Sequence, residues 1–337
     1  MIKLSKVITN LKQKLANQNN CWIVIPEGWN EKMLRAVEYI LKENLCNFVL
    51  LVRSQSEVKT DLKNNKQVQY VIVNEEVTSP EKTALTELLC KLRAHKGMTM
   101  KKANELLSMT NYYGTMLVKT KKVDGYVGGI EYSTRDTIRP ALQIVKTSKD
   151  AKIVGDYFLL ERGEEKYIFT NCAVNINPTA EQLVDLAYAS FQFAKKMGLI
   201  TPKIAFLSYS TAGSGIGEEA DKVREAVKLA SSDPRFKKLE IASELQFDAA
   251  FNEPIRRKKA PDITWGGAAD IYVFPTLNAG NIGYKIAQQL GNFSATGPIL
   301  CGLASPMNDL SRGATLTDII STIIVTAIST ERNSNEV

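Results

Sequence analysis

Short apolar runs alternate with amphipathic stretches along most of the chain, and this alternation limits the possible folds more than any other feature of the sequence. An apolar run at residues 21–25 has the pattern of a strand, residues 31–43 have the pattern of a helix with one apolar face, and residues 47–52 predict a second strand. Strands that alternate with helices form a mostly parallel sheet covered by helices. We therefore predict an α/β protein.

The same two patterns continue to the end of the chain. Near residue 150 the alternation of strand and helix patterns gives way to shorter extended segments, and we interpret this change as a domain boundary. The further strands are expected at 69–73, 123–129, 203–209, 269–274 and 295–301, and the further helices at 80–95, 99–107, 112–119, 134–146, 279–290 and 315–330.

The size and charge of the chain restrict what it binds. Its 337 residues correspond to two domains at about 100 to 200 residues per domain. The 43 Lys and Arg residues exceed the 36 Asp and Glu residues, which gives a net charge of +7 and favours anionic partners. The densest basic runs, at 119–122 and 256–259, contain no aromatic residues and match no nucleic-acid module. Phosphorylated small molecules are therefore the expected ligands.

The cysteines and the apolar segments indicate a cytoplasmic protein. The five cysteines form no C-x-x-C pair, which is typical of free thiols in a reducing compartment rather than of a disulfide framework or a zinc site. Residues 1–18 lack the apolar core of a signal peptide and have the pattern of an amphipathic helix. The most apolar segment, 319–328, is much shorter than the roughly 20 residues that span a bilayer.

The chain has a single histidine, His95, in a lysine-rich segment that we expect to be exposed. Serine and cysteine triads and H-E-x-x-H metal sites each need a placed imidazole. Acid–base chemistry would then come from Asp, Glu, Lys, Tyr or the substrate itself.

A glycine-rich turn at 210–217 follows a predicted strand and precedes a predicted helix. Such a turn can hold a phosphate, because glycines allow close approach of the backbone and the start of a helix offers free N–H groups. However, its glycines at 213, 215 and 217 match neither the dinucleotide fingerprint nor the P-loop. A plain strand-to-helix turn is an equally good interpretation.

Two polar loops in the last third of the chain combine groups that suit acyl transfer. The first, at 274–285, contains Asn281, Tyr284 and Lys285, and the second, at 302–313, ends in Ser311 and Arg312, with Asp318 shortly after it. An arginine can hold a phosphate and stabilise charge on a carbonyl oxygen, and a carboxylate can accept a proton from a thiol. The alternative is a capped helix with a surface ion pair.

Several long motifs then carry a resemblance to a known family. They include F-P-T-L-N-A-G-N-I-G-Y-K-I-A-Q-Q-L-G at 274–291 and G-P-I-L-C-G-L-A-S-P-M-N-D-L-S-R-G at 297–313. The other motifs are E-L-Q-F-D-A-A at 244–250, L-S-Y-S-T-A-G-S at 207–214, S-T-R-D-T-I-R-P-A-L-Q at 133–143 and I-P-E-G at 25–28. Together they closely resemble the phosphate acetyltransferase (phosphotransacetylase) family, including its phosphate butyryltransferase relatives.

The resemblance implies an activity and an architecture. The activity is the reversible transfer of an acetyl group between coenzyme A and inorganic phosphate, by direct attack of the thiol in a ternary complex, with acetyl phosphate as the other substrate. It needs no metal and no tightly bound cofactor. The architecture is a homodimer of chains with two α/β/α sandwich domains around an active-site cleft. One domain would comprise residues 1–148 and 296–337 and the other residues 149–295. No nucleic acid or membrane partner is implied.

The resemblance also implies roles for residues at the matching positions. Asp318 would deprotonate the thiol, Arg312 would bind phosphate or stabilise the oxyanion, Ser311 would assist that stabilisation, and Arg139 would contact the phosphate or the coenzyme. The other residues expected to bind substrate are Ser133, Thr134, Ser210, Thr211, Asn281, Tyr284 and Lys285, with phosphate contact at the glycine-rich turn. The alternatives are a phosphate butyryltransferase-type acyltransferase and a non-catalytic coenzyme-A-binding regulatory module.

Overall fold

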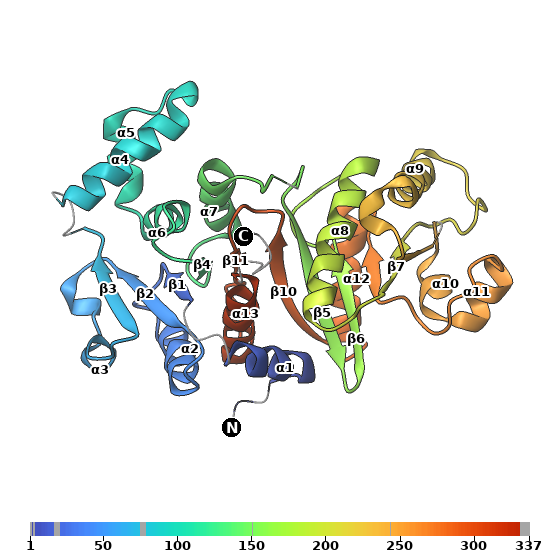
Figure 1. Cartoon of the computed structure of the whole chain (residues 1–337), viewed down its shortest axis with the longest axis horizontal. Helices are drawn as coiled ribbons and strands as arrows, with labels where there is room; N and C mark the ends of the chain where they lie inside the picture. Colours follow the sequence, from blue (N-terminus) through green and yellow to red (C-terminus); the bar gives the residue numbers. More distant parts are fainter. Residues whose placement is uncertain are drawn as a thin grey trace. The chain divides into compact units, whose positions relative to one another are not determined.

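A computed structural model describes residues 2, 4–16, 21–74, 79–149, 151–242 and 244–330. The chain divides into two compact units: a first unit of Met1–Ser148 with Leu303–Val337, and a second unit of Lys149–Gly302. Figure 1 labels most of the helices and strands of both units.

The first unit contains a five-stranded sheet in the order β11-β4-β1-β2-β3, and all its strands are parallel. Parallel strands place their carboxyl ends along one edge of a sheet, where open α/β proteins bind ligands. The strands are β1 (Trp22–Ile25), β2 (Asn47–Val52), β3 (Val68–Ile72), β4 (Gly125–Gly128) and β11 (Met307–Asp309).

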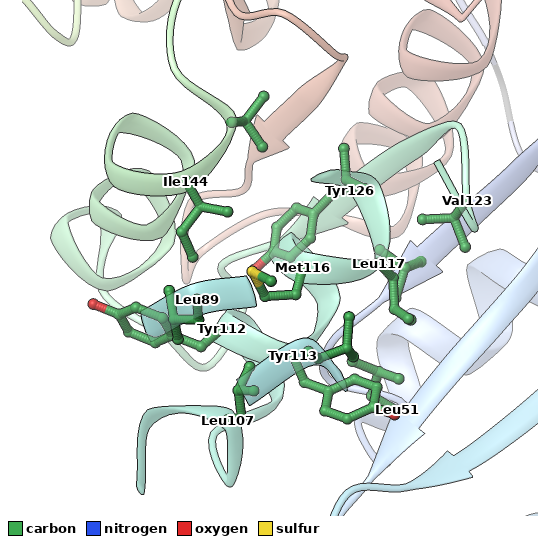
Figure 2. Close-up of a cluster of buried hydrophobic side chains, with 14 of the residues drawn as sticks. Leu51, Leu89, Leu107, Tyr112, Tyr113, Met116, Leu117, Val123, Tyr126 and Ile144 are labelled. Atoms are coloured by element: carbon green, nitrogen blue, oxygen red, sulfur yellow. The ribbon is translucent and has the colours of Figure 1, made fainter. Parts of the chain in front are cut away.

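Helices cover both faces of this sheet because its strands are apolar on both sides. Val24 belongs to a buried cluster that includes Met116 and Leu117 of α6 (Thr110–Lys119) and Tyr126 of β4 (Figure 2). On the opposite face Ile23 lies toward α13. The helices of the unit are α1 (Lys6–Leu15), α2 (Glu31–Lys42), α3 (Thr60–Lys63), α4 (Pro80–Arg93), α5 (Met100–Leu107), α6 (Thr110–Lys119), α7 (Thr134–Pro140) and α13 (Leu316–Ser329).

The second unit contains a six-stranded mixed sheet in the order β10-β5-β6-β9-β7-β8. The four neighbouring strands β6, β9, β7 and β8 are parallel to one another. Strand β5 pairs in antiparallel fashion with β10 on one side and with β6 on the other. The strands are β5 (Gly155–Arg162), β6 (Glu165–Thr170), β7 (Lys203–Phe206), β8 (Glu240–Ile241), β9 (Ile271–Val273) and β10 (Ser294–Cys301). The helices are α8 (Ala180–Lys196), α9 (Glu218–Ser232), α10 (Phe247–Phe251), α11 (Glu253–Lys259) and α12 (Leu277–Gln289). The predicted α/β fold with mostly parallel sheets is confirmed.

Three predictions from the sequence differ from the structure. The helix expected at 134–146 ends as α7 at Pro140 and continues as a π-helical turn, Ala141–Val145. Proline cannot donate to the carbonyl of Asp136, and the side-chain amide of Asn111 donates to that oxygen instead, at 2.8 Å.

The other two differences concern strands. Residues 307–309 were expected within a loop, but they form β11 through pairing with β4. The boundary expected at 296 falls inside β10, which pairs with β5 of the second unit, so residues 296–302 belong to that unit. In both cases the pairing partner lies far away in the sequence.

Candidate active site

The carboxyl ends of β1, β4 and β11 bring together the loops that carry most of the candidate residues of the first unit. The loop after β11 leads through Ser311 and Arg312 into α13, and the loop after β4 leads through Ser133 into α7. Both loops therefore open onto the edge of the sheet where ligands bind in parallel α/β folds.

Asp318 lies in the first turn of α13, where it closes a capping box with Thr315. The backbone N–H of Thr315 and its hydroxyl donate to Asp318 Oδ2 at 2.8 and 2.7 Å, and the N–H of Asp318 donates to the Thr315 hydroxyl at 3.2 Å. These bonds hold the carboxylate in one orientation. Among the described residues, Asp318 Oδ1 has no such partner, so it is available to accept a proton from a ligand.

Ser311 and Arg312 are exposed in the turn just before α13. The N–H of Gly313 donates to the Ser311 hydroxyl oxygen at 3.3 Å, and Lys32 Nζ on α2 donates to the carbonyl oxygen of Ala314 at 2.9 Å. Within the described part of the chain, the guanidinium of Arg312 forms no hydrogen bond or ion pair. The turn therefore presents an unpaired cation near the positive end of a helix dipole, and both favour an anion.

The residues of the S-T-R-D motif have mixed roles. Ser133 caps α7: its hydroxyl donates to the Asp136 carboxylate at 2.6 Å and accepts from the Asp136 N–H at 3.2 Å. Thr134 is exposed beside it, and its hydroxyl also faces the carboxyl group of Asp309. Arg139 in the last turn of α7 is partly exposed and lies close to the hydroxyl of Tyr112. Ser133 therefore shapes the helix start, and Arg139 supplies a second cation.

Two buried carboxyl groups that the sequence analysis did not single out lie beneath these loops. Glu27, just after β1, accepts hydrogen bonds from the backbone N–H groups of Gly129, Glu131 and Tyr132. Asp309 ends β11 and is 2% exposed. Burial raises the pKa of both groups, that of Asp309 to about 7, with Glu27 as a further cause. A clue was present in the sequence, because both residues stand at the end of a predicted strand or inside a family motif.

The glycine-rich turn of the second unit is organised by an internal anion. The buried carboxylate of Glu244 accepts from the N–H of Gly213 at 2.6 Å, from the Ser210 hydroxyl at 3.2 Å and from Arg224 at 3.1 Å. Thr211 is also buried, and its hydroxyl oxygen accepts from the N–H of Gln246 at 2.9 Å. Ser210 and Thr211 therefore shape the turn, and part of its anion-binding capacity is satisfied from within the protein.

The three candidate residues of α12 point in different directions. Asn281 donates to the carbonyl oxygen of Cys172 at 3.0 Å, and the Tyr284 ring stacks on Phe158 with a centroid distance of 4.1 Å. Lys285 is exposed, with its ammonium group 5.6 Å from the centroid of the Tyr284 ring. Asn281 and Tyr284 therefore fix α12 on the sheet, whereas Lys285 is free to meet a ligand.

The second unit also contains a cavity of about 400 Å³ at the carboxyl ends of β7 and β9. Phe247 and Phe274 form apolar walls, and Ser208, Glu219 and Thr276 add polar groups. A volume of this size with mostly apolar walls is typical of small-molecule sites.

The described residues contain neither a metal-binding cluster nor a membrane-spanning helix. No group of three or more His, Cys, Asp or Glu side chains there has an arrangement that would hold a metal ion. Over the same residues, no helix has both the length and the apolar character needed to cross a membrane.

Comparisons with known proteins agree with the resemblance stated above. Residues 6–327 match the family described as Phosphate acetyl/butaryl transferase. The chain is 41% identical to a phosphate acetyltransferase of Mycoplasma pneumoniae, covering 96% of this chain and 99% of that protein, and 40% identical to one of Bacillus subtilis with the same coverage. A solved phosphotransacetylase from Streptococcus pyogenes superposes with a TM-score of 0.88 at 40% identity, covering 96% of this chain and 98% of that one.

Proposed function

We propose direct attack of the thiol in a ternary complex as the mechanism of this chain, which belongs to the phosphate acetyl/butaryl transferase family. The chain is an acyltransferase that moves an acetyl group reversibly between coenzyme A and inorganic phosphate. Its curated relatives are named for acetyl transfer, so acetyl is favoured over a longer acyl group. The residue roles below are part of our proposal.

In the direction of thioester formation, Asp318 accepts the proton of the coenzyme A thiol. The thiolate sulfur then attacks the carbonyl carbon of acetyl phosphate, and the electron pair of the C=O bond moves onto oxygen. Arg312 stabilises this oxyanion or the phosphate, with help from the Ser311 hydroxyl. As the C=O bond reforms, the bond between carbon and the phosphate oxygen breaks, and phosphate leaves with that electron pair. Arg139 and Lys285 contribute further positive charge for phosphate or the coenzyme.

The observation that carries this proposal is the geometry of residues 311–318. One short segment presents an unpaired guanidinium, a hydroxyl and a carboxylate whose second oxygen is fixed by Thr315. These are the groups that thiol deprotonation and oxyanion stabilisation need. Asp318 stands in the first turn of α13, and Ser311 and Arg312 stand in the turn that leads into this helix.

The test is to mix the purified protein with acetyl phosphate and coenzyme A, without added metal, and to follow the thioester by ultraviolet absorbance. Rapid turnover is expected. Slow turnover with acetyl phosphate but fast turnover with propionyl or butyryl phosphate would indicate a longer-chain enzyme. Coenzyme A binding without transfer from any acyl phosphate would indicate a non-catalytic module.

Direct transfer predicts that no cysteine carries the acyl group. Burial raises the pKa of the Cys301 thiol to about 12 and that of Cys172 well above its usual range, so neither thiol forms a nucleophilic thiolate at neutral pH. We expect Cys301→Ala and Cys172→Ala to keep kcat within about threefold of wild type. Mass spectrometry after incubation with acetyl phosphate should find no acetylated cysteine, and an acetylated Cys172 or Cys301 would contradict direct transfer.

We also propose that the chain forms a homodimer through α12. Ile282, Ile286 and Leu290 lie along one side of this helix and are 58, 53 and 81% exposed. Their spacing of four residues makes a continuous apolar stripe, which is the kind of surface that a second copy covers.

The dimer predicts that Ile286→Asp shifts the protein to monomers, as measured by light scattering after size exclusion at micromolar concentration, because a carboxylate would be buried against the partner. Ile200→Asp is the matched control, since Ile200 is 82% exposed and lies outside the stripe. If both variants keep the molecular mass of wild type, α12 is not the interface.

The remaining parts of the proposal concern location and partners. Five cysteines without a disulfide support a reducing, cytoplasmic location. Coenzyme A, acetyl phosphate and inorganic phosphate are the proposed ligands, with no tightly bound cofactor, no catalytic metal, and no nucleic acid or membrane partner.

A further inference from the structure

Asp309 connects the loops that follow β11 and β4 at the carboxyl edge of the first sheet. It pairs with Gly128 across β11 and β4, and the next residue, Leu310, donates its N–H to the Gly128 carbonyl at 2.7 Å. Its side chain packs against Gly129: a Cβ built on that glycine would lie 2.2 Å from Asp309 Oδ1. Gly129 also has a φ of +110°, so both its conformation and its contact with Asp309 require glycine.

The backbone N–H of Gly129 is bound by the Glu27 carboxylate. The Glu27 carboxylate accepts the N–H groups of Gly129, Glu131 and Tyr132, which form the loop that leads to Ser133 and α7. The two carboxyl groups therefore enclose the start of the loop that delivers Arg139. Asp309 itself stands two residues before Ser311 on the other loop.

Asp309 Oδ1 is buried and, among the described residues, has no hydrogen-bond partner. An ionised carboxylate in that state would be strongly disfavoured, whereas a protonated carboxyl group tolerates burial better. The groups that face Asp309 do not supply a positive charge: they are Glu27 after β1, the buried Tyr126 hydroxyl on β4, and the hydroxyls of Thr134 and Thr137 on α7. The two threonine hydroxyls hydrogen-bond the carboxyl group and lower its pKa, but burial outweighs them.

From this geometry we propose that Asp309 is a positioning residue, which as a neutral acid holds the Ser311–Arg312 turn against the Gly129–Ser133 loop. The inference rests on the proposed roles of Ser311 and Arg312. Ionisation of Asp309 would place a second negative charge beside Glu27, and within the described part of the chain no cation faces these two buried groups. The two loops would then separate or admit water, and the distance between Arg312 and Arg139 would no longer be fixed.

The proposal predicts how activity depends on pH. The folded-state pKa of Asp309 is about 7, so the wild type loses the neutral form as the pH rises through that value. Asp309→Asn keeps a neutral group of the same shape at every pH. The ratio of kcat/KM for Asp309→Asn over wild type should therefore rise about threefold or more between about pH 6 and about pH 9. Asp309→Ala, which leaves a gap, should lower kcat about tenfold or more with a small change in the KM for coenzyme A.

The experiment measures kcat and KM for wild type, Asp309→Asn, Asp309→Ala and the control Asp61→Asn across this pH range, with circular dichroism to confirm folding. Asp61 is an exposed carboxylate on α3, so its ratio to wild type should stay constant. The free energy of unfolding is measured in parallel. A folded-state pKa above the unfolded value means that stability falls as the pH rises from about 4 to about 7, and Asp309→Asn should lack this fall.

A constant activity ratio across the pH range would overturn the proposal, even if the stability of the two proteins diverged with pH, because Asp309 would then be only structural. Full activity of Asp309→Ala would overturn it as well. Arg312→Ala, measured in the same series, tests the roles on which the inference rests: if it stays fully active, the proposed site fails irrespective of the Asp309 results.

Discussion

Arg312→Ala is expected to lower kcat/KM for acetyl transfer by about a hundredfold or more. The guanidinium is exposed and has no partner within the described residues, so its charge is free for the oxyanion or the phosphate. Removal of one donor of this kind costs about 3 kcal/mol of transition-state stabilisation, which corresponds to that factor in rate. Initial rates with acetyl phosphate and coenzyme A at several concentrations of each give the value.

Two further variants show whether the loss is specific. Arg35→Ala removes an exposed arginine from α2 in the same unit and should leave the rate within about twofold of wild type. Arg312→Lys should recover part of the activity, because an ammonium group carries the charge but not the planar fork. Normal turnover of Arg312→Ala would remove Arg312 from the site.

Asp318→Asn is expected to lower kcat by about two to four orders of magnitude, with little change in the affinity for coenzyme A. Asparagine has no basic oxygen, so the thiol would have to lose its proton to water. The helix start should survive, since the amide oxygen of asparagine can accept the hydrogen bond that the Thr315 N–H now donates to Asp318 Oδ2. Pre-steady-state rates separate the chemical step from binding.

Thr315→Ala provides the matched comparison for Asp318→Asn. It removes the capping hydroxyl and should lower stability by about 1 kcal/mol, but it leaves the Asp318 carboxylate in place. Its rate, measured well below the unfolding temperature, should fall far less than that of Asp318→Asn. Equal losses in the two variants would mean that Asp318 acts by capping α13 and not as a base.

The order of the elements could be predicted because it depends on local patterns. The strand at 47–52 was predicted with both of its ends, since its apolar run begins directly after Asn47 and ends directly before Arg53. The helix expected at 315–330 is observed at Leu316–Ser329, because the Thr315–Asp318 capping box is a signal of four adjacent residues. Residues 311–318 could be proposed as site residues for the same reason: their chemistry and their spacing lie within one short segment.

Three features could not be predicted because they depend on distant partners. The β11 residues have no apolar pattern of their own and become a strand only beside β4. The carboxylate of Glu244 accepts a hydrogen bond from the glycine-rich turn, although Glu244 lies 31 residues away from Gly213 in the sequence. The sequence around the turn therefore resembled an anion site with no anion of its own. The sequence also did not indicate which polar residues are buried. Ser210 and Thr211 are buried, while Arg312 and Lys285 are exposed.

The sequence by itself determined the alternation of strands and helices, the family motifs and the identity of the groups that suit acyl transfer, because each of these depends on residues that are close together in the sequence. Only the tertiary structure decided how those groups behave. Glu27 lies about 100 residues from the N–H groups that it accepts, at Gly129, Glu131 and Tyr132. Asp309 acquires a pKa of about 7 because folding buries it beside Glu27, without a cation. A carboxylate in the unfolded chain is solvated by water, and only folding replaces that water with fixed neighbours.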